Sequence, residues 1–504
     1  MAFAWRKGDA SNDFHIYEVE VQSRVVRQIT SGAGVSDFEP VYLPDGSFVF
    51  ASTRCAQVSA GSAVPATSIY TCESDGRYTR RLTFNPGSAG SLRILEDGCV
   101  LFEQSLAGVG AKPRLIQMNP DGTGQRERQA AAPAPSNRRA DGRVALAPRT
   151  SPLVRSSIVD YSKTNATVFI EDAYANPRLA GLERGDIRYI RVVALECRSA
   201  AIGSNSVCNT PVSVAGLALN VRIVLGQAKV YPDGSAFFNV PARQPLCFQA
   251  LDGNGRAIEA LRASTALQPG EMFACVGCYD EPDSVPLPHG DTATQAARAG
   301  AQELESPSNP LRGFSFIREV QPILDSSCVS CHQDRSNVRV SGDEQNGAGR
   351  VRRRNRPEPG ATNVSAFTLL GDTTLDSFSK RYWSDSYLML TRARREPVGA
   401  REGAFRTGAA RTNLVTLLQR GHRNVRLGPD ELSKIVYWTD LGMPYCGDYA
   451  EANAWNEEEK RQFEISTRNH RDQIEEEQAS IERLTSERAP PPPPRMRGGM
   501  MRRR

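Results

Sequence analysis

Two cysteines and a histidine stand together in Cys328-Val-Ser-Cys331-His332. Two thiols three residues apart can add to both vinyl groups of one porphyrin, and the adjacent histidine then reaches the iron from one face. The same three groups could form a redox or zinc site, but such a site would lack a fourth ligand. The motif therefore predicts one covalently attached haem c, with His332 as an iron ligand.

The other face of the iron has few candidate ligands, because the chain has only 5 histidines. His15 lies in the N-terminal repeats, His470 on a charged segment and His289 in a proline-rich loop. We therefore expect His422, between two helical stretches, to be the distal ligand. Met443 as the ligand, or an open position without a protein ligand, are the alternatives. If His422 does not bind the iron, we expect it to be an exposed polar residue in a turn. A second protein ligand favours electron transfer, whereas an open position permits substrate binding.

Helices are expected on both sides of this motif. Residues 316–324 place apolar side chains on one helical face that runs into Cys328. Pro429 occupies the favoured first turn of another helix. Asn456 can cap a charged helix that runs toward Arg488. We expect this last helix to be solvated; a coiled-coil partner site is the alternative.

The N-terminal region repeats itself. Ile16-Tyr17 returns as Ile69-Tyr70, and Leu43-Pro-Asp-Gly46 returns as Leu95-Glu-Asp-Gly98, a spacing typical of propeller blades. The segment Asp37-Phe-Glu-Pro-Val-Tyr-Leu-Pro-Asp-Gly46 resembles the TolB-type β-propeller repeat. A propeller needs at least about four blades to close, so we expect either a partner or second copy that completes it, or a chain that continues upstream.

Composition shifts divide the chain into a multidomain protein with a partial β-propeller (TolB/WD40-like blades), a β-sandwich-like middle domain and an α-helical cytochrome c domain. The predicted segments are 1–125 (incomplete propeller), 126–150 (linker), 151–295 (β-rich middle domain), 311–448 (cytochrome c-like domain), 449–488 (charged helix) and 489–504 (Pro/Arg tail). Within the middle domain, Cys197 and Cys208 could be bridged across one loop.

Charge and hydropathy argue against a nucleic-acid-binding protein and against a membrane-spanning protein. The formal net charge of +5 is 62 minus 57, and the five arginines of the tail account for it, so the basic balance does not indicate nucleic-acid binding. The longest apolar runs are a few residues, far below the roughly 20 that cross a membrane. We expect no membrane span, and the first residues carry no export signal.

Residues 158–465 resemble the hydrazine synthase alpha-subunit-like family, multidomain proteins with a propeller, a middle β domain and a cytochrome c domain. The resembling phrases are Gly234-Ser-Ala-Phe-Phe-Asn-Val-Pro241, Phe248-Gln-Ala-Leu-Asp252, Leu267-Gln-Pro-Gly270, Tyr437-Trp-Thr-Asp-Leu441 and Tyr445-Cys-Gly-Asp-Tyr-Ala-Glu-Ala-Asn453. In the family, the motif's histidine and a distant second histidine hold the C-terminal haem. The resemblance implies these roles for His332 and His422.

The family also carries a haem motif in its middle domain, with an unusual tyrosine ligand. The matching residues are Cys275-Val-Gly-Cys278-Tyr279, with tyrosine where the motif's histidine belongs. Three interpretations stay open: a second haem with Tyr279 near the iron, a disulfide or bare thiol pair, and a metal site that includes His289.

These patterns predict a periplasmic or other extracytoplasmic c-type cytochrome protein that transfers electrons to or from a redox partner protein, because haem is attached to thiols outside the bacterial cytoplasm. The alternative is a haem-dependent oxidoreductase whose reactive centre lies in the middle domain, around Cys275, Cys278 and Tyr279. In that interpretation Tyr279 is the catalytic candidate.

Overall fold

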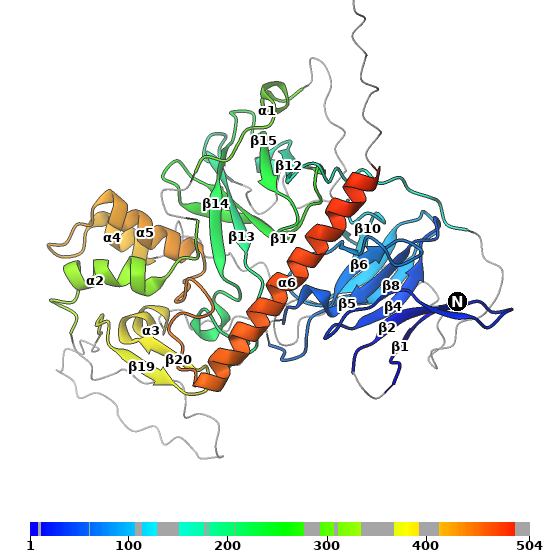
Figure 1. Ribbon diagram of the computed structural model, residues 1–504. Helices are drawn as coiled ribbons and strands as arrows, with labels where there is room; N and C mark the ends of the chain where they lie inside the picture. Colours follow the sequence, from blue (N-terminus) through cyan, green and yellow to red (C-terminus); the bar gives the residue numbers. More distant parts are fainter. Residues whose placement is uncertain are drawn as a thin grey trace, which may run out of the picture.

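The computed structural model shows a chain of several small sheets and a few helices (Figure 1). It describes residues 1–8, 12–59, 61–105, 113–128, 151–175, 179, 181–205, 207–276, 293–306, 311–333, 367–392 and 413–488. As the sequence predicts, the chain is mostly β, and in this described part the sheets are open and form no closed barrel.

Three antiparallel sheets follow one another at the N-terminus, each with the meander order of a propeller blade. Their strands are β1 (Ala2–Trp5), β2 (His15–Val19) and β3 (Val26–Gln28); β4 (Asp37–Tyr42), β5 (Phe48–Ser52), β6 (Ser68–Cys72) and β7 (Arg80–Arg81); β8 (Ala89–Ile94), β9 (Val100–Gln104), β10 (Arg114–Met118) and β11 (Arg126–Glu127). Gly46 and Gly98 close equivalent turns with positive φ of 86° and 80°. The repeat therefore folds as blade-like sheets.

A buried ion pair holds the second blade together. Arg54 binds Asp37 at 2.8 Å, and both side chains are almost completely buried. Ser52 donates a further hydrogen bond to Asp37 at 2.7 Å. Since a buried charge is costly without a partner, this pair depends on both of its members.

Two sheets pack face to face in the middle region. One has the order β15 (Ala236–Pro241), β12 (Asn165–Ile170), β18 (Met272–Cys275); the other has β14 (Arg222–Lys229), β13 (Tyr189–Leu195), β16 (Leu246–Leu251), β17 (Ala257–Thr265). Their inner faces share one core that includes Val168, Val192, Phe238 and Phe248. This arrangement is sandwich-like, and the short helix α1 (Gln295–Ala299) follows it.

The C-terminal region contains short helices and one hairpin. Its elements are the single π-helical turn Phe316–Val320, α2 (Gln321–Ser327), β19 (Thr373–Asp376), β20 (Arg381–Ser384), α3 (Asp385–Arg392), α4 (Asn413–Arg420) and α5 (Pro429–Asp440). Phe316, Trp383 and Trp438 bury their rings in a core that also contains Val193 and Val221 of the middle region. The two regions therefore share one continuous hydrophobic core.

A buried ion pair crosses the same boundary. The Arg191 guanidinium of β13 binds the Asp440 carboxylate, the last residue of α5, at 2.9 Å. The Ala257 amide donates to that carboxylate at 3.0 Å, and the Gln249 side chain donates to the Asp440 carbonyl at 2.9 Å. The end of α5 is thereby fixed to the middle sheet.

The long helix α6 (Glu457–Arg488) runs from the C-terminal region across the blades (Figure 1). Its start is capped as predicted: the Glu459 amide donates to the Asn456 side chain at 2.9 Å, and the Asn456 amide donates back to Glu459 at 2.9 Å. Farther along, Glu477 accepts a hydrogen bond from the Arg81 amide at 2.7 Å and pairs with Arg243. The expectation of a solvated helix is therefore wrong, because tertiary partners hold one face of α6.

The structure also bears on the predicted disulfide and on the possibility of a membrane span. The Cys197–Cys208 bridge is wrong: neither cysteine is in a disulfide, and the Cys208 sulfur instead accepts a hydrogen bond from Arg198 at 2.8 Å. The expectation about membranes agrees with the structure, in that none of the described helices is long and apolar enough to cross one.

Candidate functional site

The Cys-Val-Ser-Cys-His motif forms a tight turn at the end of α2. The His332 amide donates to the carbonyls of Cys328 and Val329 at 3.1 and 3.0 Å, and the Cys331 amide donates to Cys328 at 3.1 Å. Cys328 is half-buried and Cys331 is exposed. Burial, with the nearby Glu431 carboxylate, raises the pKa of the Cys328 thiol. Both thiols lie within one turn of His332, on the chain segment that would clasp a porphyrin.

His422 lies in the turn that joins α4 to α5. Gly421 and Arg423 on either side have positive φ of 82° and 56°. The His422 amide donates to the Val425 carbonyl at 3.1 Å, and the Val425 amide donates back at 3.0 Å. This closed loop fixes the backbone of His422 without any ligand.

The two histidines are brought together although 90 residues separate them in the sequence (422 minus 332). Their ring centroids are 6.1 Å apart and their planes differ by 23°. An imidazole nitrogen binds zinc at about 2 Å, and with similar bonds two imidazoles on opposite sides of one metal ion have centroids about 6 Å apart. The spacing of His332 and His422 therefore matches that of two axial ligands.

Both histidines are partly exposed, and one aromatic ring packs against the pair. The Phe367 ring packs edge-on against His332, with centroids 5.4 Å apart. A small core from α2, α4 and α5 contains Ile323, Val415, Ile435 and Val436.

Met443, the alternative ligand from the sequence, is buried in the core shared with the middle region. Its carbonyl accepts a hydrogen bond from the Tyr387 hydroxyl at 2.9 Å. The rings of His332 and His422 therefore lie close together, whereas Met443 is part of the hydrophobic packing.

The second predicted centre is described only in part. Cys275 is completely buried at the end of β18, in the core between the two middle sheets. Cys278, Tyr279 and His289 lie outside the described residues. Within the described part, no group of three or more His, Cys, Asp or Glu side chains is arranged to hold a metal ion by itself.

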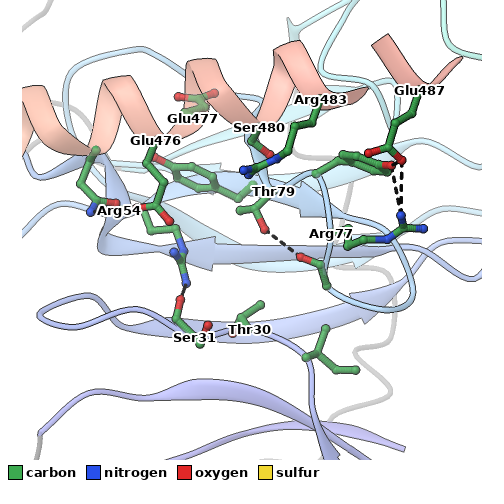
Figure 2. Close-up of a pocket in the computed structure, with 15 residues that line it drawn as sticks. Thr30, Ser31, Arg54, Arg77, Thr79, Glu476, Glu477, Ser480, Arg483 and Glu487 are labelled. Carbon is green, nitrogen blue, oxygen red and sulfur yellow. Dashed lines mark hydrogen bonds and ion pairs between the residues drawn. The ribbon is translucent and has the colours of Figure 1, made fainter. Parts of the chain in front are cut away.

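A separate cavity of about 380 Å³ lies between α6 and the second blade (Figure 2). Glu487 accepts hydrogen bonds from Tyr78 and Arg77 at one end. Arg54 and Tyr70 line the blade side, and Ser480 lines the helix side. Sequence patterns do not predict this cavity, because its walls come from segments some 400 residues apart.

Comparisons with known proteins show that the middle region matches a described family. Residues 185–280, from β13 to β18, match the family described as the hydrazine synthase alpha subunit middle domain. Hydrazine synthase from Kuenenia stuttgartiensis is structurally similar, with 16% identity, a TM-score of 0.40, and coverage of 86% of this chain and 75% of that chain. A TolB structure from Agrobacterium tumefaciens shares 23% identity over 25% of this chain and 44% of that chain, with a TM-score of 0.21. No curated protein gives a significant match.

Proposed function

We propose that this chain, whose residues 185–280 match the hydrazine synthase alpha subunit middle domain, is an extracytoplasmic c-type cytochrome protein that transfers single electrons. The observation that carries this proposal is the 6.1 Å spacing of the His332 and His422 rings beside two cysteines.

The donor set fits a haem better than a bare metal ion. Cys328 and Cys331 offer two thiols at the spacing that attaches a porphyrin, and His332 and His422 offer one nitrogen to each face of it. A zinc site would need these side chains to converge on one ion, and among the described residues no three or more His, Cys, Asp or Glu side chains are arranged to hold a metal ion. Bound there, haem would supply a one-electron iron couple whose potential depends on its axial ligands and burial.

The surroundings of the two histidines favour electron transfer over substrate binding. The backbone of His422 is held by its own turn, so little rearrangement of the chain would be needed for His422 to bind the iron together with His332. Two protein ligands leave no position for a substrate. Cys331, by contrast, is exposed, so the attachment side faces solvent, where a redox partner protein would dock.

An oxidoreductase is the second candidate, and the family match over 185–280 favours it. In this case the reactive centre would be in the middle domain, near Cys275, and the C-terminal haem would exchange electrons with it. The core that joins the two regions keeps both centres in one rigid body.

Carbon monoxide binding to the reduced protein separates these functions. With both axial positions filled by His332 and His422, we expect the ferrous spectrum to stay unchanged under carbon monoxide. A carbon monoxide adduct in the wild-type protein would show an open iron and would contradict the electron-transfer proposal.

A further inference from the structure

The cavity between α6 and the second blade is bordered by several polar groups that have no partner among the described residues (Figure 2). Its volume of about 380 Å³ lies in the range of roughly 300–1,000 Å³ that small-molecule pockets occupy. Buried polar groups in proteins are nearly always hydrogen-bonded. The groups around this cavity that lack a partner therefore indicate the chemistry of a molecule that could fill it.

Two of these groups lie on the blade side. Arg54, whose side chain is 8% exposed, donates to Asp37 and to the Ser31 carbonyl through its Nε and Nη2 atoms. Its Nη1 group has no hydrogen-bond partner among the described residues. Tyr70 is 3% exposed, and its hydroxyl also has no hydrogen-bond partner in the described part of the chain. Burial raises the pKa of this phenol well above its ordinary value, so the hydroxyl stays protonated and can donate.

The long helix contributes a third donor. Ser480 is 5% exposed, and Figure 2 shows it on the side of α6 that faces the cavity. No described residue is hydrogen-bonded to its hydroxyl. An ionised carboxylate can accept hydrogen bonds from all three donors, because its two oxygens offer about four lone-pair sites. The buried part of the cavity is therefore suited to a carboxylate.

A carboxylate of the protein itself lies near these donors. Glu476 is four residues before Ser480, so the two are neighbours on one face of α6, and Figure 2 shows Glu476 across the cavity from Arg54. Glu476 forms no ion pair with a described residue, and its hydrogen bond from Gln473 is long, at 3.5 Å. Its charge would repel a ligand that is only an anion and would attract an ammonium group.

Arg483 supplies a cation on the same face of the helix. It lines the cavity three residues after Ser480, and its guanidinium has neither an ion pair nor a hydrogen bond with any described residue. A ligand that is only a cation would meet this charge as well as that of Arg54. The lining therefore favours a molecule that carries both charges over a simple anion or a simple cation.

We propose that this cavity binds a small zwitterion of the amino acid class. Its carboxylate accepts hydrogen bonds from Arg54, Tyr70 and Ser480, and its ammonium group donates to Glu476. The binding site includes none of the predicted haem ligands, so it goes beyond the proposed electron transfer and does not depend on it.

Isothermal titration of the folded holoprotein tests the proposal with probes that separate the two charges. L-alanine carries both groups, whereas propionate has only the carboxylate and ethylamine has only the ammonium group. We expect one L-alanine to bind per chain, and each single-charge probe to bind at least about tenfold more weakly, because it lacks one charge-assisted contact. L-glutamate and L-lysine extend the same titration to longer side chains. The proposal is overturned if none of the three amino acids binds saturably, or if propionate or ethylamine binds as tightly as the amino acids.

Substitutions in the cavity wall locate the binding site. Glu476→Gln and Tyr70→Phe should each weaken amino acid binding by about tenfold, because each removes one contact to a charged group. Glu475→Gln is the matched control, since Glu475 is also on α6 but does not line the cavity; its affinity should equal that of the wild type. Wild-type affinity in Glu476→Gln, or an equal loss in Glu475→Gln, would place the binding elsewhere and overturn the proposal. The haem content of each sample is measured separately, so a failure of haem attachment is distinguished from a failure of amino acid binding.

Discussion

The ring centroids of His332 and His422 lie 6.1 Å apart, and the two ring planes differ by 23°. His332 comes from the cysteine motif, and His422 comes from a turn closed by two backbone hydrogen bonds to Val425. Two elements that are distant in the sequence thus bring their imidazole rings close together.

Replacing the distal histidine should change the spin state of the haem. In His422→Ala we expect the low-spin absorption spectrum of the wild-type protein to become high-spin, because one strong axial ligand is lost. Absorption and electron paramagnetic resonance spectra of the purified variant measure this directly.

His470 provides the matched control for that substitution. It lies on α6, where its ring contacts the Cys55 carbonyl at 2.8 Å. His470→Gln should keep the low-spin spectrum. An unchanged spectrum in His422→Ala would show that His422 is not the distal ligand, and Met443 would then be the next candidate.

Breaking the ion pair between β13 and α5 should destabilise the protein strongly. Asp440→Ala leaves the Arg191 charge buried without its carboxylate, and the side chains of both residues are at most 1% exposed. We expect a loss of about 3–5 kcal/mol in the free energy of unfolding, measured by urea denaturation.

Lys434→Ala tests whether any ion pair on α5 would have this effect. Lys434 binds Glu319 at 3.5 Å, but its side chain is 38% exposed. Its loss should cost about 0–1 kcal/mol. Equal losses in the two variants would contradict the anchoring role of Arg191 and Asp440.

The buried carboxylate of the second blade should make the fold acid-sensitive. Burial alone would raise the pKa of Asp37, but hydrogen bonds from His15, Arg54 and Ser52 and the charge of Arg54 outweigh it, so the pKa lies below its ordinary value. A carboxylate with a lowered pKa stabilises the fold above its unfolded pKa of about 3.9. That stability is lost as the pH falls through the folded pKa.

Asp37→Asn separates this effect from general acid unfolding. At pH 7 the variant should be less stable than the wild type by about 3–5 kcal/mol, because Arg54 loses its buried partner. The difference should shrink as the pH falls toward about 3. A constant difference in urea denaturation at both pH values would show that Asp37 does not contribute through its charge.

The Cys197 thiol should react slowly with alkylating reagents at neutral pH. Burial raises its pKa to about 11 and outweighs the opposing charge of Arg81 and the contact of Gln57. Because the thiolate is the reactive form, its alkylation rate should rise about tenfold for each pH unit between 7 and 9. Mass spectrometry of 192–198 after timed alkylation measures the rate; a rate that levels off near pH 8 would contradict the raised pKa.

The parts of the fold that follow local rules could be predicted from the sequence. The repeat of Ile16-Tyr17 at Ile69-Tyr70 marks equivalent blade strands, and both pairs are buried. Asn456 and Glu459 form the expected cap because capping depends on residues three positions apart. The choice of His422 as distal ligand rests on the small number of histidines and stays a prediction.

The parts that depend on tertiary contacts could not be predicted. The docking of α6 rests on Glu477, whose partners Arg81 and Arg243 come from two different regions. Nothing near Glu477 in the sequence distinguishes it from the solvated acids around it.

The number of covalent haems per chain tests the central claim most directly. The protein should be produced with an export signal in a host that has c-type maturation machinery, then denatured and assayed as the pyridine haemochrome. We expect a ratio near one, lost in Cys328→Ser combined with Cys331→Ser. A ratio near zero in the exported, folded protein would contradict the assignment of Cys328, Cys331, His332 and His422 to a haem site.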